Sequence, residues 1–281
     1  MPELAGSHGD AMPLIACARM YNVTPAARQA WARLFAWVSE ASGVALQVIE
    51  HAAPAPLEDL WRRPDLGCVF ICGWPFSRAL PQPQLIAAPI PAGHRYEGQP
   101  IYATDLIVRR DRGYRRLEDT FGGRIGWTVE GSHSGFNALR HHLLAFRSED
   151  RPRLYGESLG PAVTPATALA WVVEGRVDVA PLDSYALDLI RRHEPERVAE
   201  IEVIDSTAAA PIPPLVAGHA LDATTREALR RALLKASADS EMEPVLAELC
   251  LSGFAVAVAK DYDITLVRER AALAAGYRRP E

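Results

Sequence analysis

The chain has 281 residues, a formal net charge of −5, and hydrophobic and charged fractions of 49% and 23%, which are ordinary for a globular protein. This length is enough for two lobes of about 100–150 residues, and the acidic balance argues against a nucleic-acid-binding surface. The sequence has no apolar segment long enough to span a bilayer, and its cysteines and histidines do not have the spacing of a metal site.

The first twelve residues carry no periodic pattern and are predicted to form a loose tail. Neither the basic n-region nor the apolar h-region of a secretion signal precedes the first apolar run, which begins at Leu14. On this basis we expect a protein without a leader, which leaves a cytoplasmic location open.

The next part of the chain alternates between strand and helix patterns. Thr24 and Pro25 form a typical helix start, and Gly43 a typical helix end. The expected elements are strands at 14–20, 44–48, 68–72, 85–90 and 101–108, and helices at 25–42 and 57–61. Strand–helix–strand alternation predicts an α/β fold with a parallel sheet.

Ligands of such sheets bind beyond the carboxyl ends of the strands. Two loops are expected at such ends, residues 20–22 and 73–78. In these loops Tyr21 and Ser77 could donate hydrogen bonds to an oxyanion, and Trp74 could form a wall of the pocket. Ordinary packing at a strand end is the alternative for each of them.

The stretch from Arg124 to Leu144 combines three patterns. Alternating apolar residues at 125–129 predict a strand, 130–135 is a Gly/Ser loop, and a helical apolar stripe begins at Phe136. A strand, loop and helix in this order direct unpaired backbone N–H groups at an anion, and the hydroxyls of Ser132 and Ser134 add donors. The alternative is that one of these serines only caps the helix.

The alternation of strand and helix patterns resumes after residue 157. Thr164 and Pro165 predict a helix start, and 177–180 predicts a strand. Asp183 follows at the carboxyl end of this strand, where it could contact a ligand or cap the next helix. The remaining expected elements are a strand at 203–205 and helices at 222–236 and 243–250.

Four segments, in this order, resemble one known family. The loop resembles the S-T-S-G-F loop of the phosphate, phosphite and phosphonate substrate-binding proteins of ABC transporters, with His133 in place of Thr. The resemblance extends over residues 14–263 and is carried by the segments QPIYATDLIVRRDRGYRRLEDTFGGRIGW, SHSGFNAL, VTPATALAWVVEGRVDVAPLDSYALDLI and LCLSGFAVAVAKDYD.

The resemblance implies a two-lobed α/β clamshell of the type II periplasmic-binding-protein kind, with two hinge crossings. Residues 1–107 and 208–281 would form the first lobe, and residues 108–207 would form the second lobe with the anion loop. It implies a periplasmic binding protein, without cofactor or metal, that works as a monomer with an ABC permease and takes a small phosphorus oxyanion.

The resemblance also suggests the ligand-binding residues. Tyr102 matches the family tyrosine that contacts the phosphonate group, and His133 could serve through its ring or through its backbone N–H alone. The complete set of expected ligand contacts is Ser132, His133, Ser134, Gly135, Tyr102, Tyr21, Ser77, Asp183 and Tyr185.

The sequence departs from the family members that bind aminoethylphosphonate. Tyr185 and Pro213 stand where their two acidic residues would be, and Thr164 stands near the position of their His. A buried ammonium group without carboxylates is costly, so aminoethylphosphonate is disfavoured. Phosphate, phosphite, an alkyl phosphonate or another small oxyanion with an apolar tail remain open.

Two other functions are compatible with the same fold. A cytoplasmic enzyme acting on a small anion could use Asp183 or His133 as acid or base, and a soluble sensor could pass its closed state to a protein partner. No paired carboxylates and no nucleophile beside a base are apparent in the sequence, so a binding protein, and not an enzyme, is predicted.

Overall fold

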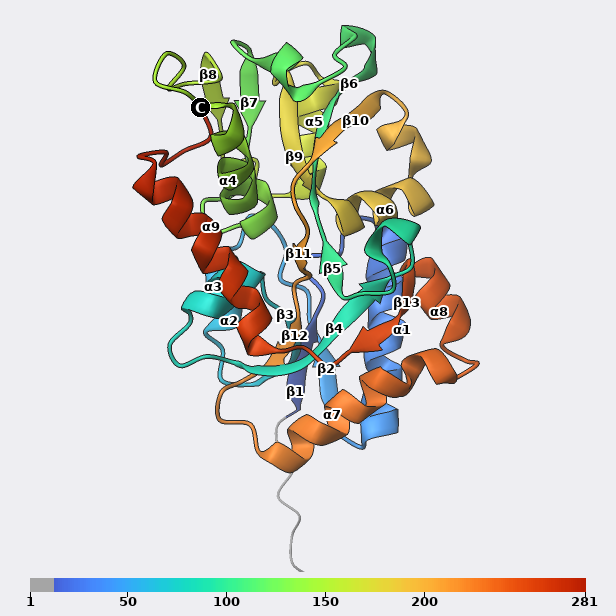
Figure 1. Cartoon of the computed structure of the whole chain (residues 1–281). Coiled ribbons are helices and arrows are strands. Elements are labelled where there is room, and N and C mark those ends of the chain that lie inside the picture. Colours follow the sequence, from blue (N-terminus) through green and yellow to red (C-terminus); the bar gives the residue numbers. More distant parts are fainter. Residues whose placement is uncertain (1–12) are drawn as a thin grey trace, which may run out of the picture.

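The computed structural model describes residues 13–281, so the expected tail and the question of a leader lie outside the described residues. Over 13–281, none of the helices combines the length and the apolar character that crossing a membrane requires. Two β-sheets with flanking helices build the molecule, and in Figure 1 one sheet lies below the other.

The lower sheet has six strands in the order β13-β4-β12-β3-β1-β2. β1 is parallel to both β2 and β3, whereas β12 and β13 run antiparallel to their neighbours. The strands are β1 (Leu14–Cys17), β2 (Leu46–Val48), β3 (Leu66–Phe70), β4 (Gln84–Pro91), β12 (Leu215–Ala217) and β13 (Leu251–Ala255). Its helices are α1 (Pro25–Ser42), α2 (Leu57–Trp61), α3 (Gly73–Arg78), α7 (Ala223–Lys235) and α8 (Glu243–Glu248).

The upper sheet has five strands in the order β10-β6-β9-β7-β8, with β7 parallel to β8 and β9 and with β6 antiparallel to β9 and β10. The strands are β6 (Thr104–Arg109), β7 (Arg124–Gly126), β8 (Glu157–Leu159), β9 (Val179–Asp183) and β10 (Ile201–Ser206). Its helices are α4 (Leu139–Leu143), α5 (Pro165–Val173) and α6 (Ser184–His193). Short 3₁₀ turns lie at His94–Tyr96, Arg110–Arg112, Leu117–Thr120, Leu144–Phe146, Pro195–Val198, Ala236–Ala238 and Ala259–Tyr262.

The chain passes between the two sheets in two neighbouring segments. β5 (Ile101–Tyr102) runs upward and β11 (Ala210–Pro211) runs back, and the two pair antiparallel with Ala210 opposite Tyr102. Thr104 at the start of β6 also donates its side-chain hydroxyl to the carbonyl of Ser134, at 3.0 Å. The segments that join the sheets are therefore attached directly to the predicted anion loop.

The predicted α/β fold is confirmed, although the bounds of several strands differ from the expected ones, and three of these differences bear on the site. The strand expected at 101–108 is divided into β5 and β6. β3 ends at Phe70, and Cys72 instead occupies the position before the first residue of α3. β7 ends at Gly126, because the N–H of Thr128 bonds the carbonyl of Gly135 at 3.2 Å and the chain leaves the sheet there.

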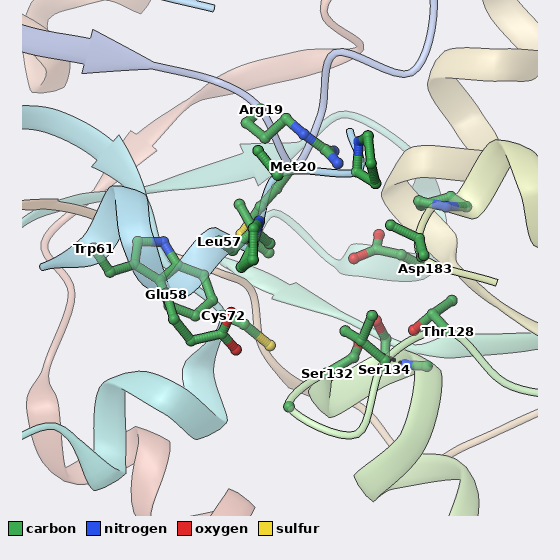
Figure 2. A pocket seen from close by; sticks show the side chains of 18 of the residues that line it. Arg19, Met20, Leu57, Glu58, Trp61, Cys72, Thr128, Ser132, Ser134 and Asp183 are labelled. Carbon is green, nitrogen blue, oxygen red and sulfur yellow. Dashed lines mark hydrogen bonds between the residues drawn. The ribbon is translucent and has the colours of Figure 1, made fainter. Parts of the chain in front are cut away.

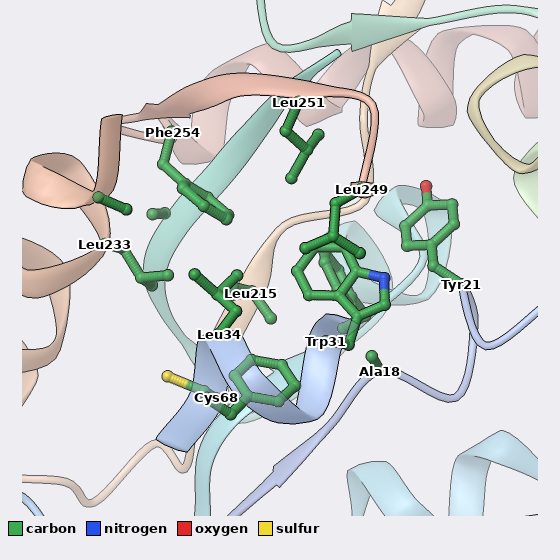
Figure 3. Close-up of a cluster of buried hydrophobic side chains, with 14 of the residues drawn as sticks. Ala18, Tyr21, Trp31, Leu34, Cys68, Leu215, Leu233, Leu249, Leu251 and Phe254 are labelled. Atoms are coloured by element: carbon green, nitrogen blue, oxygen red, sulfur yellow. The ribbon is translucent and has the colours of Figure 1, made fainter. Parts of the chain in front are cut away.

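The hydrophobic core of the lower sheet forms where α1 packs on it. Trp31 stacks on Phe35 and meets the edge of Phe70, and Leu34 lies among residues of α7, β12 and β13 (Figure 3). Thr24 caps the start of α1 by accepting from the N–H of Ala27, and Gly43 ends the helix in the left-handed region, as the sequence pattern predicts.

The last helix, α9 (Asp263–Ala274), connects the two halves of the molecule along one side (Figure 1). It contacts α3 of the lower half and α4 of the upper half. The chain that follows it stays with the upper half, since the carbonyl of Glu281 accepts from the N–H of Leu154 at 2.9 Å.

Replacing Leu34 by Ala should lower the free energy of unfolding by about 2–5 kcal/mol, because the side chain is 0% exposed and its removal leaves a cavity. Leu80, which is 95% exposed, is the matched control, and Leu80→Ala should change stability by less than about 0.5 kcal/mol. Urea titrations of both variants measure the difference. Equal effects of the two substitutions would contradict this description of the core.

Candidate ligand-binding cavity

A cavity of about 240 Å³ lies where loops of the two sheets face each other (Figure 2). The lower half contributes the segment after β1, the residues around α2, and Cys72 after β3. The upper half contributes residues 128–135, the turn before α5, and the end of β9. These residues lie in loops, in the short helix α2, or at the ends of strands and helices, and together they surround the space between the halves.

The predicted anion loop forms one side of this cavity. Ser132, Ser134 and Gly135 line it. A π-helical turn begins directly after Ser132 (His133–Ala138) and continues into α4, which makes eleven helical residues in succession. The hydroxyl of Ser132 accepts from the N–H of Gly135 at 3.0 Å, so Ser132 caps this helix and also borders the cavity.

Gly135 packs so closely against Thr128 that no residue with a side chain fits at position 135. A Cβ atom at this position would lie far inside van der Waals contact with the side chain of Thr128. Thr128 itself lines the cavity, is buried, and its hydroxyl has no hydrogen-bond partner among the described residues. A buried donor without a partner is costly, and here it lies beside the loop that is expected to hold an anion.

Tyr102 supplies a second buried hydroxyl, although the residue is not among those that line the cavity. The side chain is 2% exposed, and its hydroxyl makes no hydrogen bond to any described residue. Burial, followed by the neighbouring Cys72 and Asp183, raises its pKa well above the usual value, while Ser134 acts in the opposite direction. The hydroxyl therefore keeps its proton at neutral pH and can donate it to an acceptor near Ser134.

The ring of His133 points away from the cavity. It is 1% exposed and lies between Asn137 and Arg268, 3.1 Å from each side chain. Burial, and then the charge of Arg268, lowers its pKa to about 3, so the ring is neutral. The backbone N–H of His133 faces the lower half of the molecule, where it donates to the sulfur of Cys72 at 3.1 Å.

Arg268 connects this ring to the crossing between the sheets. Besides its contact with His133, its guanidinium donates to the carbonyls of Ala208 at 3.1 Å and Ala209 at 2.7 Å. The residue belongs to α9 and is buried. The C-terminal helix thus supports the anion loop from behind.

Asp183 combines the two roles that the sequence left open. It is the last residue of β9 and caps α6 by accepting from the N–H groups of Tyr185 and Ala186, both at 3.0 Å, and it also lines the cavity. Tyr21 donates to its second oxygen at 3.4 Å. Burial raises the pKa of this carboxyl to about 7, against the effect of these hydrogen bonds.

Three other candidates do not reach the cavity. The hydroxyl of Ser77 bonds the carbonyls of Gly73 and Tyr262 within the lower half. Tyr185 is buried in the lower core and donates to the carbonyl of Leu249 at 2.7 Å. Trp74 lies beside α9 and donates to Glu269. For these three, the packing alternative describes the observed geometry, and Tyr21 acts only through Asp183.

Several cavity residues were missed in the sequence. Cys72 looked like part of a buried strand, and Thr128 looked like the end of one. Met20 belongs to the loop 20–22 that the sequence predicted at the ligand side, although no role was assigned to it, and Arg19 was marked only by its position next to that loop. The apolar wall includes Leu57, Trp61, Val129 and Val163.

Asp183→Asn should raise the melting temperature, and the increase relative to wild type should grow between pH 4 and pH 7. In that range the folded protein holds a proton on Asp183 that the unfolded chain, with a pKa near 3.8, has released, so wild type loses stability as pH rises. Asn keeps the cap of α6 without the charge. Melting curves from pH 4 to pH 8 without ligand measure this, and a pH-independent difference would refute it.

A family model described as "ABC transporter, phosphonate, periplasmic substrate-binding protein" matches residues 22–262. No curated protein matches the chain.

Solved structures share the fold at low identity. A binding protein component of an ABC phosphonate transporter from Pseudomonas aeruginosa is 19% identical with a TM-score of 0.78, and the match covers 94% of this chain and 88% of that one. PhnD1 from Prochlorococcus marinus in complex with methylphosphonate is 16% identical with a TM-score of 0.75, over 92% and 97% of the two chains. A Xanthomonas citri protein bound to ATP is 17% identical with a TM-score of 0.61, over 95% and 98%.

These findings confirm the predicted fold and the predicted kind of protein. The matched family consists of transporter binding proteins, which favours the binding protein over the enzyme. Because the family model covers most of the sequence and includes the anion loop, this chain belongs to the periplasmic substrate-binding proteins of phosphonate ABC transporters.

Proposed function

We propose that the cavity holds a small phosphonate by its phosphorus oxyanion at Ser132–Gly135, and that closure of the two halves encloses it. The observation that carries this proposal is the pair of buried hydroxyls without partners, on Thr128 and Tyr102, beside the start of a helix. An oxyanion at this place would accept hydrogen bonds from both hydroxyls and from the first N–H groups of the helix.

The charges near the loop support a phosphonate that carries one proton. Asp183 lies on the cavity wall, and an ionised carboxylate would repel a fully ionised ligand. Because its pKa is about 7, Asp183 can share a proton with a ligand P–OH group at neutral pH. A ligand such as sulfate, which brings no proton, would gain less from this contact.

The two halves would act as the lobes of a clamshell. We assign residues 1–107 and 208–281 to the first lobe and 108–207 to the second, with β5 and β11 as the crossings. The bond from His133 to Cys72 joins the lobes on the cavity wall, so opening would break it. In this proposal the protein works as a monomer, in the periplasm, and delivers its ligand to an ABC permease.

Ser134→Ala and Tyr102→Phe should each weaken methylphosphonate binding about ten- to a hundredfold. A hydrogen bond to a charged group is worth about 1.5–3 kcal/mol, and each variant removes one donor. Isothermal titration at pH 7 measures the change. Ser252→Ala is the matched control, because this exposed hydroxyl bonds the carbonyl of Ile90 at the far edge of the lower sheet. The assignment fails if wild type binds methylphosphonate and both variants bind it equally well.

Gly135→Ala should abolish methylphosphonate binding, because the new methyl group would force the loop away from Thr128. Gly131→Ala is the control within the same loop: there a Cβ would meet only the end of the flexible Glu58 side chain, at 3.2 Å. Titration of both variants, after their circular dichroism spectra have been checked, gives the comparison. If Gly135→Ala still binds methylphosphonate, the contact between Gly135 and Thr128 is not required to hold the loop in its binding conformation.

A further inference from the structure

Arg19 lies on the cavity wall without a partner. Over residues 13–281 its guanidinium makes no hydrogen bond and no ion pair, and its Nε atom is buried without an acceptor. The neighbouring Arg28 shows the usual arrangement, since it pairs with Glu50 at 3.1 Å. Arg19 thus differs from Arg28 in having no carboxylate partner among the described residues.

Holding the unpaired charge of Arg19 partly out of water costs free energy, and an anionic ligand could offset this cost. Burial lowers the pKa of Arg19 from its usual value. Even so, a guanidinium stays protonated in proteins, so its positive charge remains partly removed from water. Withdrawing a charge from water without a counter-charge is unfavourable, and an anionic group on a ligand would supply the missing partner.

The position of Arg19 fits the far end of a ligand. In Figure 2, Arg19 and Met20 lie across the cavity from Ser132 and Ser134, with the apolar side chains of Leu57 and Trp61 to one side. A water molecule needs only about 10–15 Å³ of such space, so about 240 Å³ exceeds what a bare phosphorus oxyanion requires. The cavity therefore has room for a substituent that reaches from the loop toward Arg19.

The carboxylates of the cavity do not neutralise Arg19. Asp183 is engaged by Tyr21 and by the N–H groups at the start of α6, and Glu58 is exposed and lies near Gly131 of the loop. Arg19 also borders a second cavity of about 230 Å³, in which Glu50 is already paired with Arg28. No carboxylate of the described residues bonds Arg19.

We propose that Arg19 forms a second anionic subsite, and that the ligand is a phosphonate whose short apolar substituent ends in a carboxylate. This inference rests on the proposed function, because the loop at Ser132–Gly135 must hold the phosphonate end. Arg19 then makes a charge-assisted and potentially bidentate bond to the carboxylate. The apolar wall contacts the methylene groups between the two charged ends.

Matched ligands test the proposal on the wild-type protein. Isothermal titration at pH 7 compares phosphonoacetate, 3-phosphonopropionate and 4-phosphonobutyrate with their carboxamide analogues and with methylphosphonate. At least one acid should bind ten times more tightly than its amide, which has nearly the same shape without the charge. The proposal is overturned if methylphosphonate binds and no acid is preferred over its amide.

Variants then assign the preference to one side chain. Arg19→Gln should reduce the affinity of the preferred acid to that of its amide and leave methylphosphonate within about twofold, whereas Arg19→Lys should retain part of the preference. Arg28→Gln removes a nearby charge outside the cavity and should preserve the preference. Equal loss of methylphosphonate and acid binding in Arg19→Gln would overturn the proposal, since Arg19 would then hold the phosphonate itself.

The two proposals fail in different ways. If none of the ligands binds, methylphosphonate included, the proposed function fails and the inference fails with it. If methylphosphonate binds through Ser134 but the acids show no preference that depends on Arg19, only the second anionic subsite is wrong.

Discussion

Gly135 and Thr128 approach each other so closely that a Cβ atom at position 135 would collide with the side chain of Thr128. This contact, with the hydrogen bond from the N–H of Thr128 to the carbonyl of Gly135, turns the chain out of β7 and back over itself. The turn places Ser134 on the cavity wall and lets Thr104 hold the carbonyl of Ser134. This one close contact therefore fixes three parts of the molecule relative to one another: the predicted anion loop, the end of β7 and the crossing between the sheets.

The loop presents hydrogen-bond donors without a full positive charge. The donors near it are neutral hydroxyls and the backbone N–H groups at a helix start, and the carboxyl groups that line the cavity beside them belong to Asp183 and Glu58. Such a site recognises an oxyanion by the direction of its oxygens and by its protons more than by its charge. Among residues 13–281, the fully positive side chain that lines the cavity is that of Arg19, on the opposite side.

Much of the fold could be predicted because its signals are local. Thr24, Gly43 and Thr164 cap helices as their residue types predict, and the strand–loop–helix pattern around Ser132 is present. The roles of buried side chains could not be predicted in this way. Whether an aromatic residue at a strand end faces a cavity or a core depends on distant partners, as the bond from Tyr185 to Leu249 illustrates.

The cavity residues without a motif were the hardest to predict. Cys72 follows a strand that ends two residues earlier than its apolar run suggests, and this shift turns an expected core residue into part of the cavity wall. Arg19 belongs to no sequence motif, and what distinguishes it is that its guanidinium has no hydrogen-bond partner among residues 13–281. Both depend on how two separate sheets come together, which no local pattern encodes.

The burial of the His133 ring has a consequence for regulation by acidity. A histidine in a ligand loop ordinarily suggests release of the ligand in mildly acidic surroundings, because such a side chain gains a proton near neutrality. Here the ring lies against Arg268 with a pKa of about 3, and it stays neutral at neutral and mildly acidic pH. The loop therefore keeps one electrostatic state, and any sensitivity of ligand capture to acidity has to come from Asp183 or from the ligand's own protons.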